Sequence, residues 1–438
     1  MGHGLPSVER VSSDRPGAAR GDAPGEPSAG AVPGGRWSGH ERGTPGYRRV
    51  VVALFAAGVA TFAQLYSVQA VLPSLATGLH VGAPQAALGV SVATGALALS
   101  VIGWSAVADR TGRVPAMVAS AVAATVLGLA VPFAPGLGPL LVLRALQGAA
   151  LGGLPAVAMA FLAEEVHARE VTRAAAVYVA GTSLGGLTGR IVSATVADLA
   201  GWRWGVAAVA VVGALATTAF CVGVPRARGA VRTRRGAGPP LTSRLRAALR
   251  DPALLALYAQ ALLLMGAFVT VYNYLGFRLL EPPFSLSQTV VGLLFVVYLA
   301  GTASSSVAGR LAAGDHRLPV LVTSTAVFAG GAVLTLSSHL GLVVAGLVAL
   351  TAGFFAAHAV ASGWVGSRAA PGVRAQASAL YTFAYYLGSS LVGWLGGLAL
   401  AAGGWGAVVG CVGALAVLAA GLAVLVLRTR RPAGSMSA

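Results

Sequence analysis

A short charged cluster interrupts a long apolar stretch of this sequence at residues 105–117, SAVADRTGRVPAM. Asp109, Arg110 and Arg113 fall within five residues, and the chain on either side carries almost no charge. Such a cluster has two interpretations. The arginines can anchor a turn at a membrane surface beside a solvated carboxylate. Alternatively Asp109, which is unfavourable at the C-terminal end of its own apolar helix, is stabilised by the N-terminus of another helix.

Two arginines and one histidine fall inside apolar stretches, where a charged side chain needs a partner or a cavity. Arg144 lies one helical turn from Gln147, so both share one helix face, although Arg144 is close enough to the end of its stretch to reach the membrane surface. For Arg190 the sequence supports a structural anchoring role and a functional role equally. His358 is either a hydrogen-bonded core residue or a proton carrier, because histidine has an unperturbed pKa of about 6.5.

Other chemistries lack the residues that they need. Cys221 and Cys411 both lie in apolar runs with no metal ligands nearby, so we expect packed side chains. Glu164 and Glu165 are adjacent and would point about 100° apart on a helix, so they do not make a catalytic pair. The 30 basic residues are all arginine, which excludes a GxxxxGK[ST] phosphate loop. We therefore expect no enzyme activity, no metal and no cofactor.

The composition indicates a membrane protein. Of the 438 residues 56% are hydrophobic and 10% are charged, with a mean hydropathy of +0.78, whereas a soluble domain is about a quarter charged. A bilayer core about 30 Å thick requires roughly 20 apolar residues as helix. That length predicts an all-α integral membrane protein with twelve transmembrane helices, at 50–72, 84–107, 115–134, 139–163, 173–196, 203–224, 253–276, 288–309, 318–337, 341–364, 375–400 and 405–427.

The positive charge indicates orientation rather than nucleic-acid binding. The formal net charge is +17, yet all arginines except Arg144, Arg190, Arg203 and Arg278 lie in alternate loops or at the two ends. By the positive-inside rule these loops and both termini are cytoplasmic. No folded basic face for nucleic acid is visible. We expect a multi-pass monomer of the cell membrane whose partners are the lipid bilayer, a small-molecule substrate and protons.

An internal repeat relates the two halves of the chain. A shift of 204 residues places SAVADRTGRVPAMVASAV from Ser105 over GRLAAGDHRLPVLVTSTA from Gly309, with Arg113 over Arg317. The repeat divides the spans into six-helix bundles at 50–224 and 253–427 around a basic cytoplasmic linker at 225–252. Residues 1–49, rich in Gly, Pro and Ala, are expected to be a disordered tail, and 428–438 a second tail. Two facing bundles suit a solute carrier that rocks about a midplane site.

Together with two further motifs, these features resemble the major facilitator superfamily over residues 50–427. The family signature between spans two and three is matched by Asp109, Arg110, Gly112 and Arg113, with Ser105 in place of a glycine. The matches in spans four and five are Arg144, Gln147 and Gly148, and the antiporter-like series Gly181, Gly185, Gly186, Gly189 and Arg190.

The resemblance implies roles for these motifs. Asp109 would be a latch that meets the start of span eleven, residues 374–378, only while the cytoplasmic side is closed. Ala313 stands where the second half would have an acid, so the latch is one-sided. Arg144 would serve the cavity or coupling. The glycines of span five, four residues apart, allow close helix packing, and the resemblance implies that they meet the other half and support antiport.

Polar and aromatic side chains inside the spans are candidates for lining the substrate site, and Tyr272 and Tyr274 fit a belt at the membrane surface instead. A lining of aromatic and amide groups suits a moderately hydrophobic organic solute. The two arginines within the spans keep an anionic substrate as an alternative. The resemblance to efflux members implies export of a small organic molecule or drug by proton antiport. The lack of Asp and Glu in spans one, seven, eight, ten and eleven favours the alternative, facilitated diffusion or uptake. The lining candidates are Gln64, Gln69, Asn273, Tyr298, Tyr381 and Tyr385.

Overall fold

The computed structural model describes residues 37–229, 241–370 and 372–428 together with the first two residues of the chain. The segment Met1–Trp37 forms a unit of its own, and the helices belong to the second unit, Ser38–Ala438. Throughout the described ranges there is no β-strand, and His40 and Val166 form one isolated parallel bridge. The all-α fold predicted from the sequence is confirmed.

Eight helices form the first half of the second unit. They are α1 (Pro45–Leu65), α2 (Leu72–Leu79), α3 (Ala83–Thr111), α4 (Arg113–Ala130), α5 (Leu137–Leu151), α6 (Gly153–Glu165), α7 (Val171–Ala200) and α8 (Trp202–Gly223).

Seven helices form the second half. They are α9 (Leu241–Arg250), α10 (Pro252–Leu280), α11 (Gln288–Leu293), α12 (Tyr298–Leu311), α13 (Arg317–Leu334), α14 (Leu340–Arg368) and α15 (Arg374–Leu422).

Ten helical stretches in the described part of the chain are long and apolar enough to cross a membrane. One of them, Arg374–Leu427, contains two spans, because the backbone leaves helical geometry at Gly403 and Gly404. Gly404 has a φ of 64°, a conformation that glycine adopts without strain. The 30-residue helix α7 is not among the ten, although it is long enough to span. Counting α7 and both parts of α15 recovers the twelve predicted spans.

The ends of the helices follow the 204-residue repeat. Helix α4 begins at Arg113 and α13 begins at Arg317, which is 204 residues later. Helix α7 begins at Val171 and α15 begins at Arg374, 203 residues later. The internal repeat seen in the sequence is therefore a repeat of structure, and the two bundles are pseudo-symmetric.

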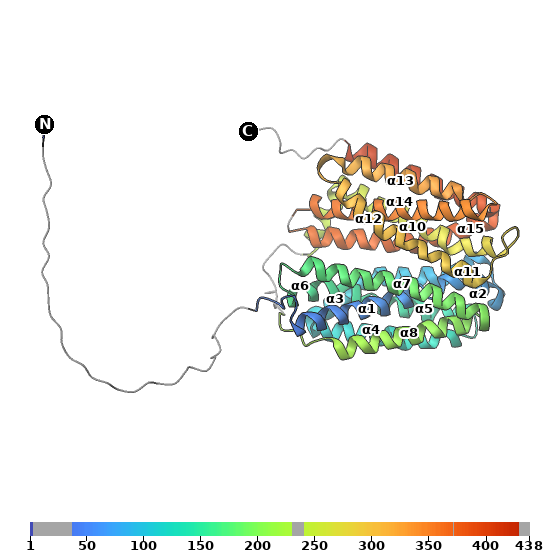
Figure 1. Ribbon diagram of the computed structural model, residues 1–438, viewed down its shortest axis with the longest axis horizontal. Helices are drawn as coiled ribbons and strands as arrows, with labels where there is room; N and C mark the ends of the chain where they lie inside the picture. Colours follow the sequence, from blue (N-terminus) through green and yellow to red (C-terminus); the bar gives the residue numbers. More distant parts are fainter. Residues whose placement is uncertain (3–36, 230–240, 371, 429–438) are drawn as a thin grey trace. The chain divides into compact units, whose positions relative to one another are not determined.

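Helices α1–α8 gather in one bundle and α10–α15 in a second one beside it (Figure 1). The bundles touch through α3 with α15 and through α7 with α11. Large apolar side chains such as Leu99, Leu199, Leu215 and Val222 remain exposed on the outside. Because each helix satisfies its own backbone hydrogen bonds, such a surface suits contact with lipid.

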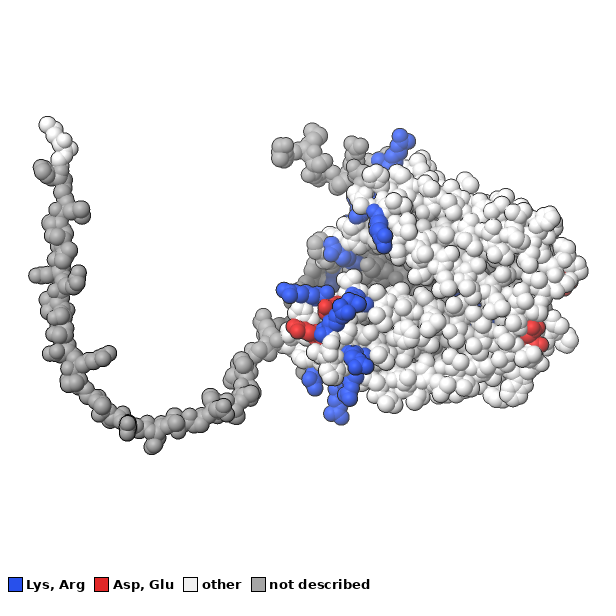
Figure 2. All heavy atoms as spheres, viewed as in Figure 1, with Lys and Arg blue, Asp and Glu red and all other residues white. Residues whose placement is uncertain are grey.

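Arginine side chains gather at one end of the bundles (Figure 2). We call this the arginine-rich end; the α3–α4 turn, the start of α7 and the start of α15 lie there. We call the other end, with the turns at 80–82 and 281–287, the arginine-poor end. Arg203 and Arg278 lie at this end, and each donates to backbone carbonyls beyond the end of a neighbouring helix. These two arginines therefore satisfy carbonyls that helix ends leave without a donor.

The structure changes two predicted boundaries. The prediction of a disordered tail over 1–49 is wrong for its last part, because α1 begins at Pro45 and the backbone of His40 donates to the carbonyl of Glu165 at 2.7 Å. Residues 3–36 lie outside the described residues, as do 230–240 of the predicted linker and 429–438 of the second tail. The linker also contains a helix, α9, that the sequence analysis did not anticipate.

Candidate functional site

Arg190 of α7 is only 3% exposed and lies among aromatic rings rather than beside a carboxylate. Its guanidinium carbon is 4.2 Å from the centre of the Tyr66 ring in the first bundle. The ring centres of Tyr298 and Phe295, from the second bundle, lie 4.9 and 5.0 Å away. Ring faces attract a cation, so this charge is held at the boundary of the bundles by aromatic groups from both of them.

A chain of hydrogen bonds runs from Arg190 across that boundary. Its Nε donates to Oε1 of Gln69 at 2.7 Å, and its Nη1 donates to the carbonyl of Gly186 at 2.8 Å. Gln69 in turn donates from Nε2 to Oδ1 of Asn273 in α10 at 2.7 Å. Both amide side chains are buried. The structure thus joins three of the predicted site residues, Arg190, Gln69 and Asn273, in one network.

Arg144 of α5 has different surroundings. It is fully buried, donates from Nε to the carbonyl of Gly89 at 2.9 Å, and donates from Nη1 to the carbonyl of Gln64 at 3.0 Å. Nη2 donates to the carbonyl of Leu65. Because α1 ends at Leu65, its last carbonyls have no partner within the helix and carry partial negative charge. Arg144 therefore completes the end of α1, and the interpretation that it reaches the membrane surface is wrong.

Gln64, Gln147 and Gly148 belong to this same packed region. Gln147 accepts from Arg144 and donates from Nε2 to Oε1 of Gln64 at 3.3 Å. A Cβ on Gly148 would collide with the backbone of Ala93 in α3. These contacts all lie inside the first bundle. The lining role of Gln64 and the cavity or coupling role of Arg144 stay predictions.

His358 of α14 is hydrogen-bonded and packed against rings. Its Nδ1 is 3.0 Å from the hydroxyl of Tyr381, and its ring centre is 4.9 Å from that of Tyr385. With Gln260 of α10, His358 and Tyr381 line a small cavity inside the second bundle. The sequence analysis named His358 as a proton carrier and Tyr381 and Tyr385 as lining candidates without relating them, and the structure brings the three into contact.

The sequence analysis missed the phenylalanines that join the predicted residues Tyr298 and His358 into a wall of aromatic side chains in the second bundle. Phe268 stacks on Phe354 with ring centres 4.1 Å apart, and Tyr298 lies 5.8 Å from Phe355. Phe354 also stacks on His358 at 6.0 Å. We call Phe268, Tyr298, Phe354, Phe355 and His358 the aromatic wall. Its signal in the sequence is the i, i+4 spacing of Phe268 with Tyr272 and of Phe354 with His358, which puts each pair on one helix face.

The interpretation of Tyr272 and Tyr274 as surface belt residues is wrong. Tyr272 is 3% exposed and its hydroxyl lies 2.6 Å from that of Thr351. Tyr274 is fully buried and donates to the carbonyl of Trp394 at 3.2 Å. Helix α10 is buried along most of its length, so these tyrosines find partners inside the bundle instead of at the membrane surface.

The glycine series of α7 packs against α1. A Cβ on Gly185 would lie 2.5 Å from the carbonyl oxygen of Val59, and one on Gly189 would lie 2.5 Å from that of Ala63. Gly181 faces the backbone of Phe55 in the same way. The predicted close helix contact is confirmed, but the expectation that this face meets the other half is wrong, because α1 and α7 belong to the same bundle.

The charged cluster that opened the sequence analysis lies at the arginine-rich end. Arg113 pairs with Asp109 at 2.9 Å and with Glu164 of α6 at 3.2 Å. The Asp109 side chain is 66% exposed, and Arg110 is exposed as well. Gly112 separates α3 from α4 with a φ of 98°, which favours glycine. In this structure, then, the carboxylate of Asp109 is paired within its own bundle.

Ser105, in place of the family's glycine, donates its hydroxyl to the carbonyl of Val101 within α3. Its position and residues 374–378 at the start of α15 are half-exposed or exposed, except for Ala377. The second bundle has an ion pair of its own at this end, Arg368 with Asp251 at 2.9 Å. The pairs of Arg113 with Asp109 and Glu164 and of Arg368 with Asp251 thus each stay within one bundle.

Hydrogen bonds between the bundles gather toward the arginine-poor end. Asp198, near the end of α7, accepts from the hydroxyl of Thr289 at 2.7 Å and from the backbone of Gln288 at 3.3 Å. Gln288 also accepts from the hydroxyl of Ser74 at 2.9 Å and donates to the carbonyl of Ala70. We call these contacts, with the bond from Gln69 to Asn273, the arginine-poor gate.

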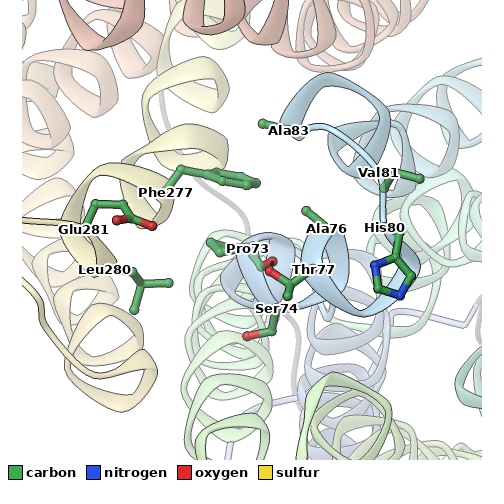
Figure 3. Close-up of a pocket in the computed structure, with 10 residues that line it drawn as sticks. All are labelled: Pro73, Ser74, Ala76, Thr77, His80, Val81, Ala83, Phe277, Leu280 and Glu281. Atoms are coloured by element: carbon green, nitrogen blue, oxygen red, sulfur yellow. Dashed lines mark hydrogen bonds between the residues drawn. The ribbon is translucent and has the colours of Figure 1, made fainter.

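A cavity of about 470 Å³ opens beside this gate. Figure 3 shows Ser74, Thr77 and His80 of the first bundle on one side of it and Phe277 and Glu281 of the second on the other. Ser74 belongs both to this gate and to the wall of the cavity. Within the described residues no group of three or more metal-ligating side chains occurs.

Comparison with known proteins fits this architecture. Residues 54–282 match the Major Facilitator Superfamily. The chain is 40% identical over 379 residues to the inner membrane transport protein YnfM of Escherichia coli (strain K12), covering 86% of this chain and 90% of that protein. It is 38% identical over 371 residues to the uncharacterized MFS-type transporter YybF of Bacillus subtilis (strain 168), covering 85% and 91%.

Solved structures show the same fold at low sequence identity. A bacterial homolog of the human lysosomal transporter Spinster, in an inward-facing and unoccupied conformation, has a TM-score of 0.76 at 15% identity, covering 89% of this chain and 100% of that one. A mutant of the nucleoside transporter NupG has a TM-score of 0.70 at 13% identity, covering 86% and 99%. With its two pseudo-symmetric bundles, its motifs and these relatives, the chain belongs to the Major Facilitator Superfamily of membrane transporters.

Proposed function

We propose that this transporter exports a small organic molecule across the cell membrane by alternating access, in exchange for protons, and acts as a monomer. The observation that carries the proposal is the uneven distribution of contacts between the bundles. They are hydrogen-bonded at the arginine-poor gate, whereas Asp109 at the other end is paired with its own bundle. A protein that alternates between two states needs such a difference between its ends.

The arginine-rich end, with both termini, is cytoplasmic in this proposal, because positively charged loops stay on that side of the membrane. The structure then corresponds to a state that is closed toward the outside. The bundles at 50–224 and 253–427 rock as two bodies about the centre, where Arg190 and the aromatic wall lie.

Asp109 acts as the latch of the opposite state. When the cytoplasmic side closes, its carboxylate leaves Arg113 and meets the N-terminus of α15 near Arg374, where backbone N–H groups and the helix dipole favour an anion. The exposed pair that it leaves contributes little stability, about 0–1 kcal/mol. The exchange of partners is therefore inexpensive enough to occur in each cycle.

His358 carries the proton in this proposal. It is hydrogen-bonded to the hydroxyl of Tyr381 and belongs to the aromatic wall, which reaches the boundary between the bundles at Tyr298. Histidine titrates near physiological pH in its unperturbed state, and the spans offer no Asp or Glu away from their ends. Tyr381 would hold the ring in place while it gains and loses the proton.

Sealed proteoliposomes test the proposal. Purified protein is reconstituted around a pH-sensitive dye, and cationic, neutral and anionic organic compounds are added under an imposed pH gradient. We expect a compound-dependent pH change that falls at least about tenfold in Asp109→Asn and in His358→Ala. The controls Glu41→Gln and His339→Ala remove an exposed acid and an exposed histidine near helix starts and should keep the activity. A pH change that survives both test variants contradicts the assigned roles.

Facilitated diffusion or uptake is the second candidate, because the described spans hold no carboxylate away from their ends to carry a proton. In the same vesicles, flux of a compound down its own gradient without any pH change supports this candidate and removes His358 from the mechanism.

A further inference from the structure

We infer that the substrate is an organic anion, an aromatic or strongly apolar carboxylate, and that Arg190 binds its carboxylate group. The inference rests on the proposed function, since it names the class of solute that the carrier moves. It starts from the charges of the membrane interior. All 13 acidic residues of the sequence lie in tails, loops or the terminal turns of helices, so Arg144 and Arg190 face no carboxylate within the spans.

The two arginines differ in how their charge is compensated. Arg144 donates to three backbone carbonyls and to Gln147, and two of those carbonyls belong to the negative end of the α1 dipole. Arg190 has two hydrogen-bond acceptors, the side chain of Gln69 and the carbonyl of Gly186, which lies in the same helix. Its Nη2 donates no hydrogen bond among the described residues. Arg190 is thus the less compensated of the two buried cations.

The network around Arg190 has more donors than acceptors. Gln69 uses its oxygen to accept from Arg190 and its nitrogen to donate to Asn273. The Nδ2 group of Asn273 is buried and has no acceptor. Polar groups that are buried without partners are costly, and a carboxylate supplies up to four lone pairs for donors of this kind. An arginine fork also matches a carboxylate with two parallel bonds.

The rings around Arg190 specify the rest of the ligand. Tyr66, Phe295 and Tyr298 surround the guanidinium, and Tyr298 continues into the aromatic wall through Phe355. Aromatic surfaces bind flat apolar groups through stacking and burial. A ligand with a carboxylate at one end and an apolar or aromatic body at the other fits this pairing. A cationic compound would add a positive charge beside an arginine that already lacks a counter-ion.

Three matched probes test the inference: 2-naphthoate, 2-naphthamide and 2-naphthylmethylamine, which share a ring system and differ in charge. Binding to the purified full chain is followed by the rise in melting temperature with probe concentration. We expect 2-naphthoate to bind at least about tenfold more tightly than the amide, and the amine to be weaker than both. Equal or tighter binding of the amide or the amine overturns the inference, and so does the absence of saturable 2-naphthoate binding.

Variants locate the effect at one side chain. Arg190→Gln should abolish the preference for 2-naphthoate, and Arg190→Lys, which keeps the charge without the fork, should retain part of it. Arg203→Gln is the matched control, because Arg203 also stacks on a ring, Trp202 at 4.5 Å, and donates to carbonyls. If Arg190→Gln is unstable, the order of the three probes on the wild type decides. A preference that persists in a folded Arg190→Gln overturns the assignment.

Transport in proteoliposomes separates this inference from the proposed function. Transport of 2-naphthoate but not of the amine supports both the proposed function and the anion inference. Movement of a cationic or neutral compound with no carboxylate transported keeps the transporter proposal and overturns the anion inference. Failure of every compound to move, with functional vesicles proved by an added ionophore, counts against both.

Discussion

Gln69 and Asn273 are hydrogen-bonded at 2.7 Å and are 204 residues apart, the same offset that aligns the sequences of the two halves. They are therefore equivalent positions of the repeat. Two equivalent positions of a two-fold arrangement meet only near its axis, so the pseudo-two-fold axis of this transporter passes close to this bond. Arg190, which donates to Gln69, lies next to the axis at the boundary of the bundles.

Replacing Asn273 by Ala should open the arginine-poor gate. The variant loses a buried hydrogen bond between the bundles, worth about 1 kcal/mol, and Gln69 loses its acceptor. The equilibrium should shift about fivefold toward the state in which this end is open. Spin labels at Thr77 and Glu281, on opposite sides of the cavity in Figure 3, report the change as a longer distance.

Ser304→Ala is the control for that measurement, because Ser304 donates to the carbonyls of Gly301 and Ala352 inside the second bundle. Both cysteines, Cys221 and Cys411, are changed to serine in every variant so that only the labels react. An unchanged distance distribution in Asn273→Ala would show that this bond does not hold the gate.

Gly185→Ala should separate α1 from α7. Its Cβ would lie 2.5 Å from the carbonyl oxygen of Val59, and a backbone atom cannot move aside cheaply. We expect a loss of about 1–3 kcal/mol in stability, measured as a lower melting temperature. Gly103→Ala on α3 is the matched change, since a Cβ there meets nothing within 4 Å, and it should be neutral or stabilising by up to about 1 kcal/mol.

Arg144→Gln should weaken the fold rather than one binding step. The change removes three hydrogen bonds to the carbonyls of Gly89, Gln64 and Leu65, each worth about 0.5–1.5 kcal/mol. Expression and melting temperature should both fall. Arg144→Lys restores the charge at the end of α1; if its stability recovers while transport does not, the predicted coupling role of Arg144 gains support.

The ion pair of Asp251 with Arg368 should make stability depend on pH. Burial by itself raises the pKa of Asp251, but hydrogen bonds from Arg368 and from the backbone of Ala253 outweigh it and hold that pKa below its usual value of 3.8. A depressed carboxyl pKa stabilises the folded state above about pH 4, and the stabilisation is lost as the pH falls through the folded pKa. Melting curves of the wild type and of Asp251→Asn should differ at pH 7, with the wild type more stable, and converge below pH 4. A constant difference would exclude the ion pair as its cause.

Most of the fold could be predicted from the sequence, because the spans and the loops between them follow from local composition. The predicted span 318–337 and the observed helix α13, Arg317–Leu334, begin one residue apart. The repeat was visible for the same reason, since Arg113 and Arg317 mark equivalent helix starts. Helix α9 was missed because it is short and its few apolar residues lie among arginines.

The site was harder to predict, because contacts between helices decide it. Arg144 and Arg190 look alike in the sequence, yet one completes the end of α1 and the other lies among rings from both bundles. The tyrosines Tyr272 and Tyr274 carry no local mark of being buried. The partner of a long helix in a bundle depends on packing across many residues, and single-sequence spacing does not show it.

Because most arginines lie at one end, a protease that cuts after arginine finds accessible cleavage sites mainly on one face of the membrane. At the arginine-poor end the enzyme meets Arg203 and Arg278, and both are engaged with backbone carbonyls and stacked on rings. At the other end exposed sites such as Arg110 and Arg374 are open to it. With the arginine-rich end cytoplasmic, as proposed, intact cells should protect the chain from trypsin, and inverted membrane vesicles should let it be cut into fragments.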